Sequence, residues 1–445
     1  MTYEEAMTFV EDSNQYGSVL GLDSMRSLLD GLGNPQNQLK FVHIAGTNGK
    51  GSTAAYIATI MAAAGYHVGR YISPSVLEYR EKIQISFRQN LVKDGNPVTT
   101  RYISETGIAN CINEIKRVCE HMVEAEMPHP TLFEIETAMA MMYFIQENCN
   151  LVVLEVGLGG RLDATNVINT TECAVLTSIS MDHMHILGNT LELIATEKAG
   201  IIKTGIQVVS YEQKTEANKV IEAVSKQNGA NLNVADFNKL MIEVQGLDGT
   251  IFSYDDLSKV RIQLLGENQV KNAVVSILAV KALQKIGYII SEDDIRTGLY
   301  HTKWRGRFEI IKSNPLFLVD GAHNEDAAIS LAKNIKTYFA NKRVIFVVGV
   351  LKDKDYDAVL RHTGCLAEKI ITITPNNSRG LKSDILAKTA SKYCSQVIDA
   401  VKVSEAIKLA YEAISEDNVI IAFGSLSYLK EVYEELKCMG GNYGS

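Results

Sequence analysis

The sequence predicts an α/β protein whose first and larger part contains a doubly wound parallel sheet. Short runs rich in β-branched residues alternate with longer helical stretches along the 445 residues, and this alternation is typical of βαβ units. Residues 151–156 form an apolar run that only Glu155 interrupts, as expected for a parallel strand buried on both faces. A Gly-rich loop at residues 45–53 follows one strand and opens a helix, which is the local order of a phosphate-binding loop.

The elements follow one another in two series along the chain. In the first series, strands are expected at residues 41–45, 67–72, 151–156 and 174–179, and helices at residues 51–64, 104–126 and 132–146. A helix at residues 293–299 separates it from the second series. There, strands are expected at residues 316–319, 344–348, 370–373 and 419–422, and helices at residues 326–338, 383–393 and 404–414. We therefore expect two domains, residues 1–300 and residues 301–445, which fits the usual size of domains.

Composition and charge narrow the class of protein. Asp plus Glu (52) exceed Lys plus Arg (44), and the resulting net charge of −8 argues against a nucleic-acid partner. No stretch reaches the roughly 18 consecutive apolar residues of a membrane helix, and the acidic start lacks a signal segment. The seven cysteines are scattered without CxxC spacing. We therefore expect reduced thiols in a cytoplasmic protein, with neither a disulfide framework nor a zinc site.

The loop at residues 45–53 carries the strongest chemical signal and reads A-G-T-N-G-K-G-S-T. Its glycines let the backbone approach phosphate oxygens closely, and the helix N-terminus adds positive potential. Lys50 is placed to reach the β- and γ-phosphates, and the hydroxyl of Ser52 or Thr53 is a candidate Mg²⁺ ligand. The alternative is a Gly-rich turn with an incidental lysine, because Ile44 stands where the strict motif has its first Gly. The loop alone leaves kinases, GTPases, motors and ligases open.

Ionisable side chains follow two further strands. Glu155 ends the strand at residues 151–156, and Asp182 and His183 follow the next strand. Because ligands in open α/β sheets bind beyond the carboxyl ends of the strands, Glu155 is a candidate Mg²⁺ ligand. The alternatives are an ordinary strand-end charge at Glu155, a loop histidine at His183 and a solvated helix-end lysine at Lys198.

Several longer segments occur together and in a fixed order. They include the loop at 45–53, L-E-V-G-L-G-G-R-L-D-A-T-N at 154–166, E-K-A-G-I-I-K at 197–203, G-R-F-E at 306–309 and D-G-A-H-N at 320–324. With these segments the chain resembles the folylpolyglutamate synthase/dihydrofolate synthase family of the Mur-ligase superfamily. The segment at 154–166 separates this family from the cell-wall Mur ligases.

The resemblance implies an ATP- and Mg²⁺-dependent amide ligase, with a P-loop central domain and a smaller, Rossmann-like C-terminal glutamate-ligase domain. ATP would phosphorylate a carboxylate of a folate or of dihydropteroate, and the amine of L-glutamate would displace the phosphate. The expected partners are these small molecules, with no nucleic acid and no membrane, and the chain is expected to be a monomer. Two rivals stay open: another Mur-type amino-acid ligase, and a P-loop ATPase that switches a partner protein.

The resemblance also implies roles for residues of this chain. The implied catalytic residues are Lys50, His183 and Lys198, with Lys198 carbamylated. The implied Mg²⁺ ligands are Ser52, Ser73, Glu155, His183 and Lys198. The implied ATP contacts are Gly46, Thr47, Asn48, Gly49, Lys50, Gly51, Ser52, Asn272, Arg307 and Asp320. The implied pterin contacts are Thr131, Phe133, Glu134, Leu162, Asp163 and Ala164, and the residues linked to the incoming glutamate are His323 and Ser425.

Three positions depart from the family's pattern. Ser75 follows Ser73-Pro74 where the family often has His, Asn268 replaces the His of a G-x-H-Q motif, and Arg305 stands where Pro usually precedes Gly-Arg. These departures concern loop details and pterin contacts rather than the ligase chemistry.

Overall fold

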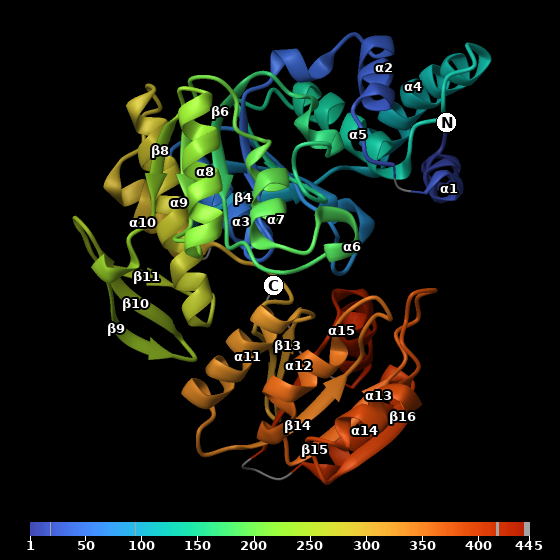
Figure 1. Ribbon diagram of the computed structural model, residues 1–445, viewed down its shortest axis with the longest axis vertical. Helices are drawn as coiled ribbons and strands as arrows, with labels where there is room; N and C mark the ends of the chain where they lie inside the picture. The colour runs from blue at the N-terminus through green and yellow to red at the C-terminus, as the bar shows by residue number, and fades with distance from the viewer. Residues whose placement is uncertain (18, 94, 415–417, 440–445) are drawn as a thin grey trace.

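The chain folds into two lobes, each organised by its own sheet. The computed structural model describes residues 1–17, 19–93, 95–414 and 418–439. An eight-stranded sheet organises the larger lobe, residues 1–301, and a six-stranded sheet organises the smaller lobe, which begins at residue 309. Residues 302–308 join the lobes and are called the connector below. Figure 1 shows the larger lobe above, in blue to yellow, and the smaller lobe below, in orange to red.

The sheet of the larger lobe has the strand order β4-β3-β2-β5-β1-β6-β7-β8. Its strands are β1 (Phe41–Ala45), β2 (Val68–Tyr71), β3 (Ile83–Lys93), β4 (Asn96–Tyr102), β5 (Leu151–Glu155), β6 (Thr171–Leu176), β7 (Gln207–Ser210) and β8 (Asn231–Val234). Six neighbouring strands of this order are parallel to one another: β2, β5, β1, β6, β7 and β8. The β3–β4 hairpin, which the sequence patterns do not predict, pairs antiparallel with β2 at one edge of the sheet. Ile44 pairs with Glu155 and Ala45 with Leu176, so the loops after β1, β5 and β6 meet at one edge of the sheet.

Helices cover both faces of this sheet. The helices of the lobe are α1 (Tyr3–Asp12), α2 (Asp23–Gly31), α3 (Lys50–Ala63), α4 (Glu105–Glu124), α5 (Leu132–Gln146), α6 (Met184–Leu187), α7 (Leu191–Ala199), α8 (Thr215–Gln227), α9 (Glu267–Lys285) and α10 (Glu292–His301). Helices α3, α9 and α10 pack on the face that presents Val42 and Val153. Helices α1, α2, α4 and α5 cover the opposite face at Val152, and α7 and α8 cover it at Ala174. The alternation of buried side chains to both faces explains why these strands are apolar throughout.

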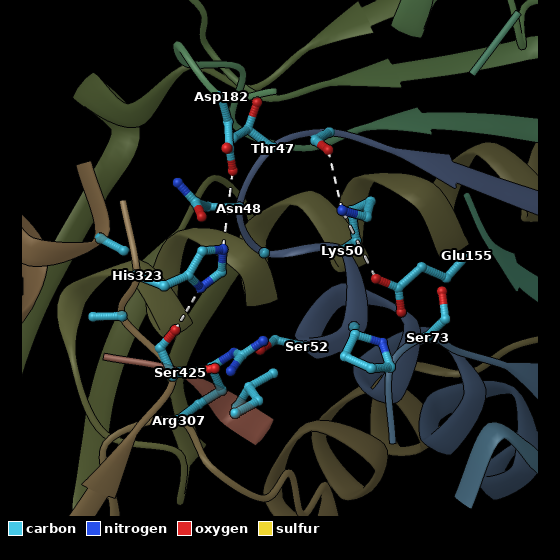
Figure 2. A pocket seen from close by; sticks show the side chains of 18 of the residues that line it. Thr47, Asn48, Lys50, Ser52, Ser73, Glu155, Asp182, Arg307, His323 and Ser425 are labelled. Atoms are coloured by element: carbon cyan, nitrogen blue, oxygen red, sulfur yellow. Dashed lines mark hydrogen bonds and ion pairs between the residues drawn. The ribbon is translucent and has the colours of Figure 1, made fainter. Parts of the chain in front are cut away.

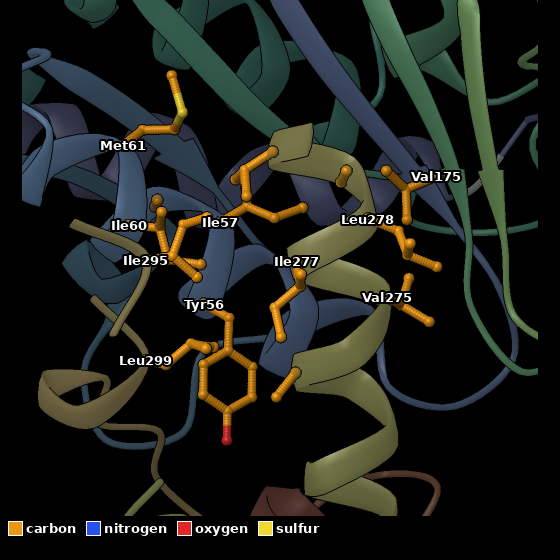
Figure 3. Close-up of a cluster of buried hydrophobic side chains, with 14 of the residues drawn as sticks. Tyr56, Ile57, Ile60, Met61, Val175, Val275, Ile277, Leu278, Ile295 and Leu299 are labelled. Carbon is orange, nitrogen blue, oxygen red and sulfur yellow. The ribbon is translucent and has the colours of Figure 1, made fainter. Parts of the chain in front are cut away.

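Helix α3, which begins at the Gly-rich loop, is the centre of the first of these layers. It is buried on nearly all sides, and Figure 3 shows Ile57 and Ile60 packed between Ile277 of α9 and Leu299 of α10. Gly298 allows α10 to approach closely, because a Cβ there would lie 2.6 Å from the backbone nitrogen of Ile60. The phosphate-loop helix is therefore fixed by packing rather than by its own propensity.

A three-stranded antiparallel sheet extends from the larger lobe, at the left of Figure 1. It consists of β9 (Leu240–Gly246), β10 (Gly249–Tyr254) and β11 (Leu257–Ile262) in the order β11-β10-β9. Gln245 Nε2 donates to the hydroxyl of Tyr338 in the smaller lobe at 3.0 Å, so this sheet touches both lobes. The sequence patterns do not predict it, because β9 is half exposed and mixes polar with apolar residues.

The smaller lobe repeats the layered arrangement. Its strands are β12 (Glu309–Ser313), β13 (Leu316–Asp320), β14 (Arg343–Val348), β15 (Lys369–Ile373), β16 (Val397–Val401) and β17 (Asn418–Phe423), in the order β12-β13-β17-β14-β15-β16. Its helices are α11 (Glu325–Tyr338), α12 (Tyr356–Thr363), α13 (Ser383–Ala390), α14 (Val403–Ala413) and α15 (Leu429–Cys438). Helices α11 to α13 cover one face and α14 and α15 the other, and only β12 is antiparallel. The expected fold class, a doubly wound P-loop domain with a smaller Rossmann-like α/β domain, is confirmed.

Within the residues that the structure describes, no helix is long and apolar enough to cross a bilayer.

Candidate active site

The Gly-rich loop lies between β1 and α3, at the edge of the sheet that faces the smaller lobe. The backbone N–H groups of Thr47 and Asn48 donate to Ser178 O at 2.7 and 3.2 Å, which braces the loop against the segment after β6. Gly49 has φ 91°, and a Cβ there would lie 2.6 Å from Asn272 Oδ1, so only glycine fits this turn. The first-turn N–H groups of α3 have no acceptor within the helix, and together with the helix dipole they favour an anion.

Two lysines converge on this loop. Lys50 Nζ donates to Gly46 O at 3.2 Å, and Lys198 Nζ donates to the same oxygen at 3.0 Å. Lys198 lies at the end of α7 but is buried, so it is not the solvated helix-end lysine that its sequence context allows. Burial, with the nearby Lys50 ammonium, lowers the pKa of Lys198 to about 7.

Glu155 closes the other side of the loop. Its carboxylate lies 3.9 Å from Lys50 Nζ, and Figure 2 shows the two side chains facing one another beside Ser73. Burial raises the pKa of Glu155 to about 7, although Lys50, Arg307 and a backbone hydrogen bond from Ser73 oppose that rise. A buried carboxylate that its neighbours compensate only in part is suited to a further cation.

The donor set around Glu155 fits magnesium bound with a nucleotide. Among the described residues, no three His, Cys, Asp or Glu side chains gather as a metal cluster. Mg²⁺ is usually held by one or two carboxylates, together with phosphate oxygens and waters, rather than by a cage of protein ligands. Glu155, Ser52, Ser73 and His183 line the same cavity and supply one carboxylate, two hydroxyls and an imidazole.

A second polar cluster joins the two lobes at Asp182. Lys354 Nζ of the smaller lobe donates to Asp182 Oδ1 at 2.8 Å, and Asn324 Nδ2 lies 3.3 Å from Asp182 Oδ2 and 3.1 Å from Asn48 Oδ1. Burial alone would raise the pKa of Asp182, but the Lys354 ammonium holds it well below its usual range. His183 and His323 flank the carboxylate, each at 3.9 Å. Burial lowers the pKa of both imidazoles to about 4, so they are neutral near pH 7.

Arg307 and Asp320 stand where the connector meets the smaller lobe. The carboxylate of Asp320 accepts from the backbone N–H groups of Phe308 and Ala322, both at 2.8 Å, and thereby fixes the end of the connector. Arg307 donates to Gly306 O at 3.1 Å, and burial lowers its pKa, while Asp320 and Glu155 act in the opposite direction. A cation from the smaller lobe's side thus faces the acidic end of β5 in the larger lobe.

These groups line one cavity of about 440 Å³ between the lobes. Figure 2 shows Lys50, Glu155 and Ser73 on one side of it and His323, Arg307 and Ser425 on the other. Every residue expected to hold ATP, magnesium or the incoming glutamate lines this cavity: Gly46, Thr47, Asn48, Gly49, Lys50, Gly51, Ser52, Ser73, Glu155, His183, Lys198, Asn272, Arg307, Asp320, His323 and Ser425. A site built from both lobes must bind its ligands where they meet.

Comparison with known proteins identifies the family. The Mur ligase middle domain matches residues 44–280, and the glutamate ligase domain of Mur ligases matches residues 306–426. A dihydrofolate synthase/folylpolyglutamate synthase of Bacillus subtilis (strain 168) is 34% identical, over 98% of this chain and 99% of its own length. The chain belongs to the folylpolyglutamate synthase/dihydrofolate synthase family.

Solved structures of this family share the whole two-lobed fold. A folylpolyglutamate synthase of Thermotoga maritima has 32% identity and a TM-score of 0.83, over 99% of this chain and 98% of the other. The Mycobacterium tuberculosis folylpolyglutamate synthase, solved in complex with ADP and AMPPCP, has 28% identity and a TM-score of 0.86 and covers both chains fully.

The expected pterin-binding residues of the family lie apart from the cavity. Thr131 and Glu134 cap α5 reciprocally, and Asp163 accepts from the backbone N–H groups of Leu158 and Thr165. Thr131, Phe133, Glu134, Leu162, Asp163 and Ala164 do not line the cavity. Phe133 nevertheless lies against Gly157, whose added Cβ would come 2.6 Å from the ring, and Gly157 does line it. Whether these residues contact a pterin stays a prediction.

Sequence reasoning misses the residues that join the lobes. Lys354 and Asn324 come from the smaller lobe, and Asp182 gains its importance only from the partners that reach it across the cleft. Asn324 is in a quoted motif, but nothing in the sequence pairs it with Asn48, which lies 276 residues earlier. The one available signal was the number of charged residues in L-K-D-K-D at 351–355.

Proposed function

We propose that this protein joins L-glutamate to a carboxylate of dihydropteroate or of a folate, with ATP converting that carboxylate to an acyl phosphate. As a member of its family the chain is an ATP-dependent ligase that requires Mg²⁺. The observation that carries the residue assignments is the single cavity that combines the phosphate loop of the larger lobe with cations of the smaller lobe.

The cavity suits a reaction between two anions. A carboxylate and a triphosphate repel one another, so their approach requires fixed positive charge. Lys50 lies at the loop beside Glu155, and Arg307 faces the same carboxylate from the connector. Bound Mg²⁺ would neutralise phosphate charge there, with Glu155, Ser52, Ser73 and His183 as its candidate ligands. We assign Lys50 and Arg307 to the transferred phosphoryl group.

The smaller lobe is suited to the incoming amino acid. His323 and Ser425 line the cavity on that side, and Lys354, only 9% exposed in its side chain, adds a buried ammonium. Burial lowers the pKa of His323 to about 4, so its imidazole is neutral near pH 7 and can accept a hydrogen bond. These groups offer a cation for a carboxylate of L-glutamate and neutral acceptors for its ammonium.

We assign Lys198 to the part of the reaction that takes place at the Gly-rich loop of the larger lobe. Its buried amine donates to Gly46 O, and Lys50 donates to the same oxygen. The family resemblance implies that this lysine is carbamylated, which would replace a buried cation by an anion near the loop. Solution ¹³C NMR at neutral pH of protein held in ¹³C-bicarbonate tests the assignment, because a lysine carbamate is lost in acid. The absence of a carbamate carbonyl signal that Lys198→Arg abolishes would contradict it.

Further proposals concern the pterin contacts, the domain boundary, the oligomeric state and the location of the protein. We propose residues 131–134 and 162–164 as the support of the pterin ring, since Phe133 adjoins the cavity at Gly157. We propose a division into two domains near residue 300, between α10 and β12. A monomeric state and a cytoplasmic location are also proposals.

A panel of acceptors tests the function. Purified protein is incubated with ATP, Mg²⁺ and L-glutamate, and with dihydropteroate, several folates or a UDP-muramoyl acceptor, and the products are read by mass spectrometry. We expect glutamyl adducts of dihydropteroate, of a folate or of both, with Lys50→Ala as the inactive control. An adduct of the UDP-muramoyl acceptor alone would support a different Mur-type ligase. ATP hydrolysis without any adduct would support an ATPase switch.

A further inference from the structure

A second cavity, of about 350 Å³, lies beside the active site in the larger lobe. It is enclosed by α3, β2, the β3–β4 hairpin and the connector. Of the described residues that line it, three are Lys or Arg (Arg70, Lys303, Arg305), one is a histidine (His301) and only Glu81 is acidic. Its walls also include Ile72, Pro74, Val76, Val98, Tyr102 and Trp304. Pro74 lines both cavities, so they are direct neighbours.

Arg70 is the buried cation of this cavity. The residue is 5% exposed, yet among the described residues no carboxylate oxygen lies within 4.0 Å of its guanidinium. Its Nη2 donates to Gln84 Oε1, and its Nε is buried without an acceptor. Glu81 and Glu155 act on Arg70 only from a distance, and the Glu81 carboxylate accepts from the backbone N–H groups of Val76 and Leu77 at 2.7 and 3.0 Å. A buried charge without a counter-ion is costly, which favours binding of an anion at this point.

The two neighbouring cations are stabilised in other ways, so Arg70 is the cation of this cavity whose buried charge needs an anion. Arg305 lies 3.4 Å from the carboxylate of Glu309, and Lys303 is exposed to solvent. A carboxylate carries a single negative charge and accepts two parallel hydrogen bonds from a guanidinium. A phosphate ester carries nearly two charges, which this single buried cation would not balance. Carboxylate is therefore the anion that fits.

Trp304 gives the cavity a flat apolar wall. Arg70 Cζ lies 5.3 Å from the centroid of its ring, and its indole Nε1 is buried without an acceptor. The other edge of the ring packs on Gly51, in the first turn of the phosphate-loop helix. Trp304 is also the only tryptophan of the chain, so the tryptophan fluorescence comes from a wall of this cavity.

We propose that the second cavity binds a small organic molecule through one carboxylate, which Arg70 receives while the ring of Trp304 holds the molecule's body. Two sources present this chemistry. One is the glutamyl tail of a folate acceptor, and that source rests on the function proposed above. The other is free L-glutamate, at a site separate from the one proposed for the reacting amino acid at His323 and Ser425. The wall shared at Pro74 would place either molecule next to the acceptor carboxylate.

Fluorescence of Trp304 tests the proposal in the full-length protein without nucleotide. The wild type is titrated with tri-γ-L-glutamate, with L-glutamate and with inorganic phosphate, at constant ionic strength. We expect a saturable change with at least one of the two carboxylate probes. Arg70→Met should raise the dissociation constant at least about tenfold. Arg101→Met is the matched control, since Arg101 is exposed on the same hairpin and pairs with Glu147 outside the cavity.

The outcomes separate the sources and can overturn the proposal. A response to the tripeptide alone identifies the glutamyl tail, and a response to L-glutamate identifies the free amino acid. No saturable response of the wild type to either carboxylate probe would overturn the proposal. So would a carboxylate response that Arg70→Met leaves unchanged, or an equal affinity for phosphate that Arg70→Met weakens in the same way. If Arg70→Met does not fold, the wild-type titration still tests the proposal, because the absence of a saturable response to the carboxylate probes overturns it. Because no nucleotide is present, a failure here is distinct from a failure to form glutamyl adducts.

Discussion

The two lobes contribute to the active site in different ways. In the larger lobe, Lys50, Glu155 and Lys198 find their partners within the lobe, at the carbonyl of Gly46 or at one another. In the smaller lobe, Lys354 and Asn324 find theirs across the cleft, on Asp182 and Asn48. The first set is fixed by the packing of one sheet and its helices. The second set depends on how the lobes stand relative to one another.

This difference separates two kinds of function. Groups held within the larger lobe can bind and polarise phosphate whatever the smaller lobe does. Groups that cross the cleft complete the site only when the lobes are together, as in lid-gated enzymes. Substitutions in the first set should abolish turnover, and those in the second set should give graded effects.

Lys50→Ala should have the largest effect. Removing the loop ammonium leaves the transferred phosphoryl group without its nearest cation, and kcat should fall at least about a thousandfold. Steady-state ADP release measures it, with Lys40→Ala, an exposed lysine paired with Glu172, as the control. A variant that kept more than a tenth of the wild-type rate would remove Lys50 from the mechanism.

Arg307→Ala should have the next largest effect. Arg307 acts on Glu155 from the connector, so its loss should lower kcat about a hundredfold while the larger lobe still binds nucleotide. Nucleotide affinity by calorimetry and kcat by ADP release are measured together. Arg361→Ala, at an exposed arginine of the smaller lobe, is the control. Equal losses of affinity and of kcat would show that the two lobes do not divide the work in this way.

Asn324→Ser should reduce turnover about tenfold with little change in stability. Serine can still cap α11, where the Asn324 side chain now accepts from Ala327 N–H, but it cannot reach Asn48 and Asp182. The melting temperature and kcat are compared with those of Asn238→Ser, an exposed site in the larger lobe. An unchanged kcat would contradict a role for these cross-cleft bonds.

The smallest effect concerns stability within the larger lobe alone. His43 on β1 is fully buried against Thr165 Oγ1, and burial, with Lys203, lowers its pKa to about 3. The unfolded chain binds this proton with an ordinary pKa near 6.5, so acid favours unfolding as the pH falls below that value. From about pH 7.5 to about pH 6, His43 should cost roughly 0.8 kcal/mol of unfolding free energy.

Urea unfolding of His43→Gln measures this contribution. The variant should lose less stability than the wild type over the same pH interval, because glutamine does not titrate. His121→Gln, at an exposed histidine beside Glu124, should behave as the wild type does. The same pH dependence in wild type and His43→Gln would show that His43 does not report on the larger lobe's stability.

Much of the fold could be predicted from the sequence, because its central strands are buried on both faces. The apolar runs at β1 and β5 and the helix at α5 need no knowledge of their neighbours, and the structure confirms them. The β3–β4 hairpin and the sheet of β9 to β11 were not predicted. Their strands are half exposed and mix charged with apolar residues, so their pairing depends on tertiary contacts.

The active-site residues likewise fall into those that local sequence predicts and those whose role depends on tertiary contacts. The Gly-rich loop could be recognised because its chemistry is local, and Glu155 because it ends a strand beside that loop. Lys198 looked like a solvated lysine, and its burial became visible only once α7 was placed against the loop. Lys354 and the partners of Asp182 could not be found, because sequence distance hides contacts between lobes.

The central claim is that one cavity couples ATP cleavage to amide formation between an acceptor and L-glutamate. The most direct test is ADP release by the wild type when acceptor and glutamate are supplied together and when each is left out in turn. We expect steady ADP release only with both substrates present, one ADP for each glutamyl adduct, and none with Lys50→Ala. Steady ADP release that does not depend on glutamate would contradict it.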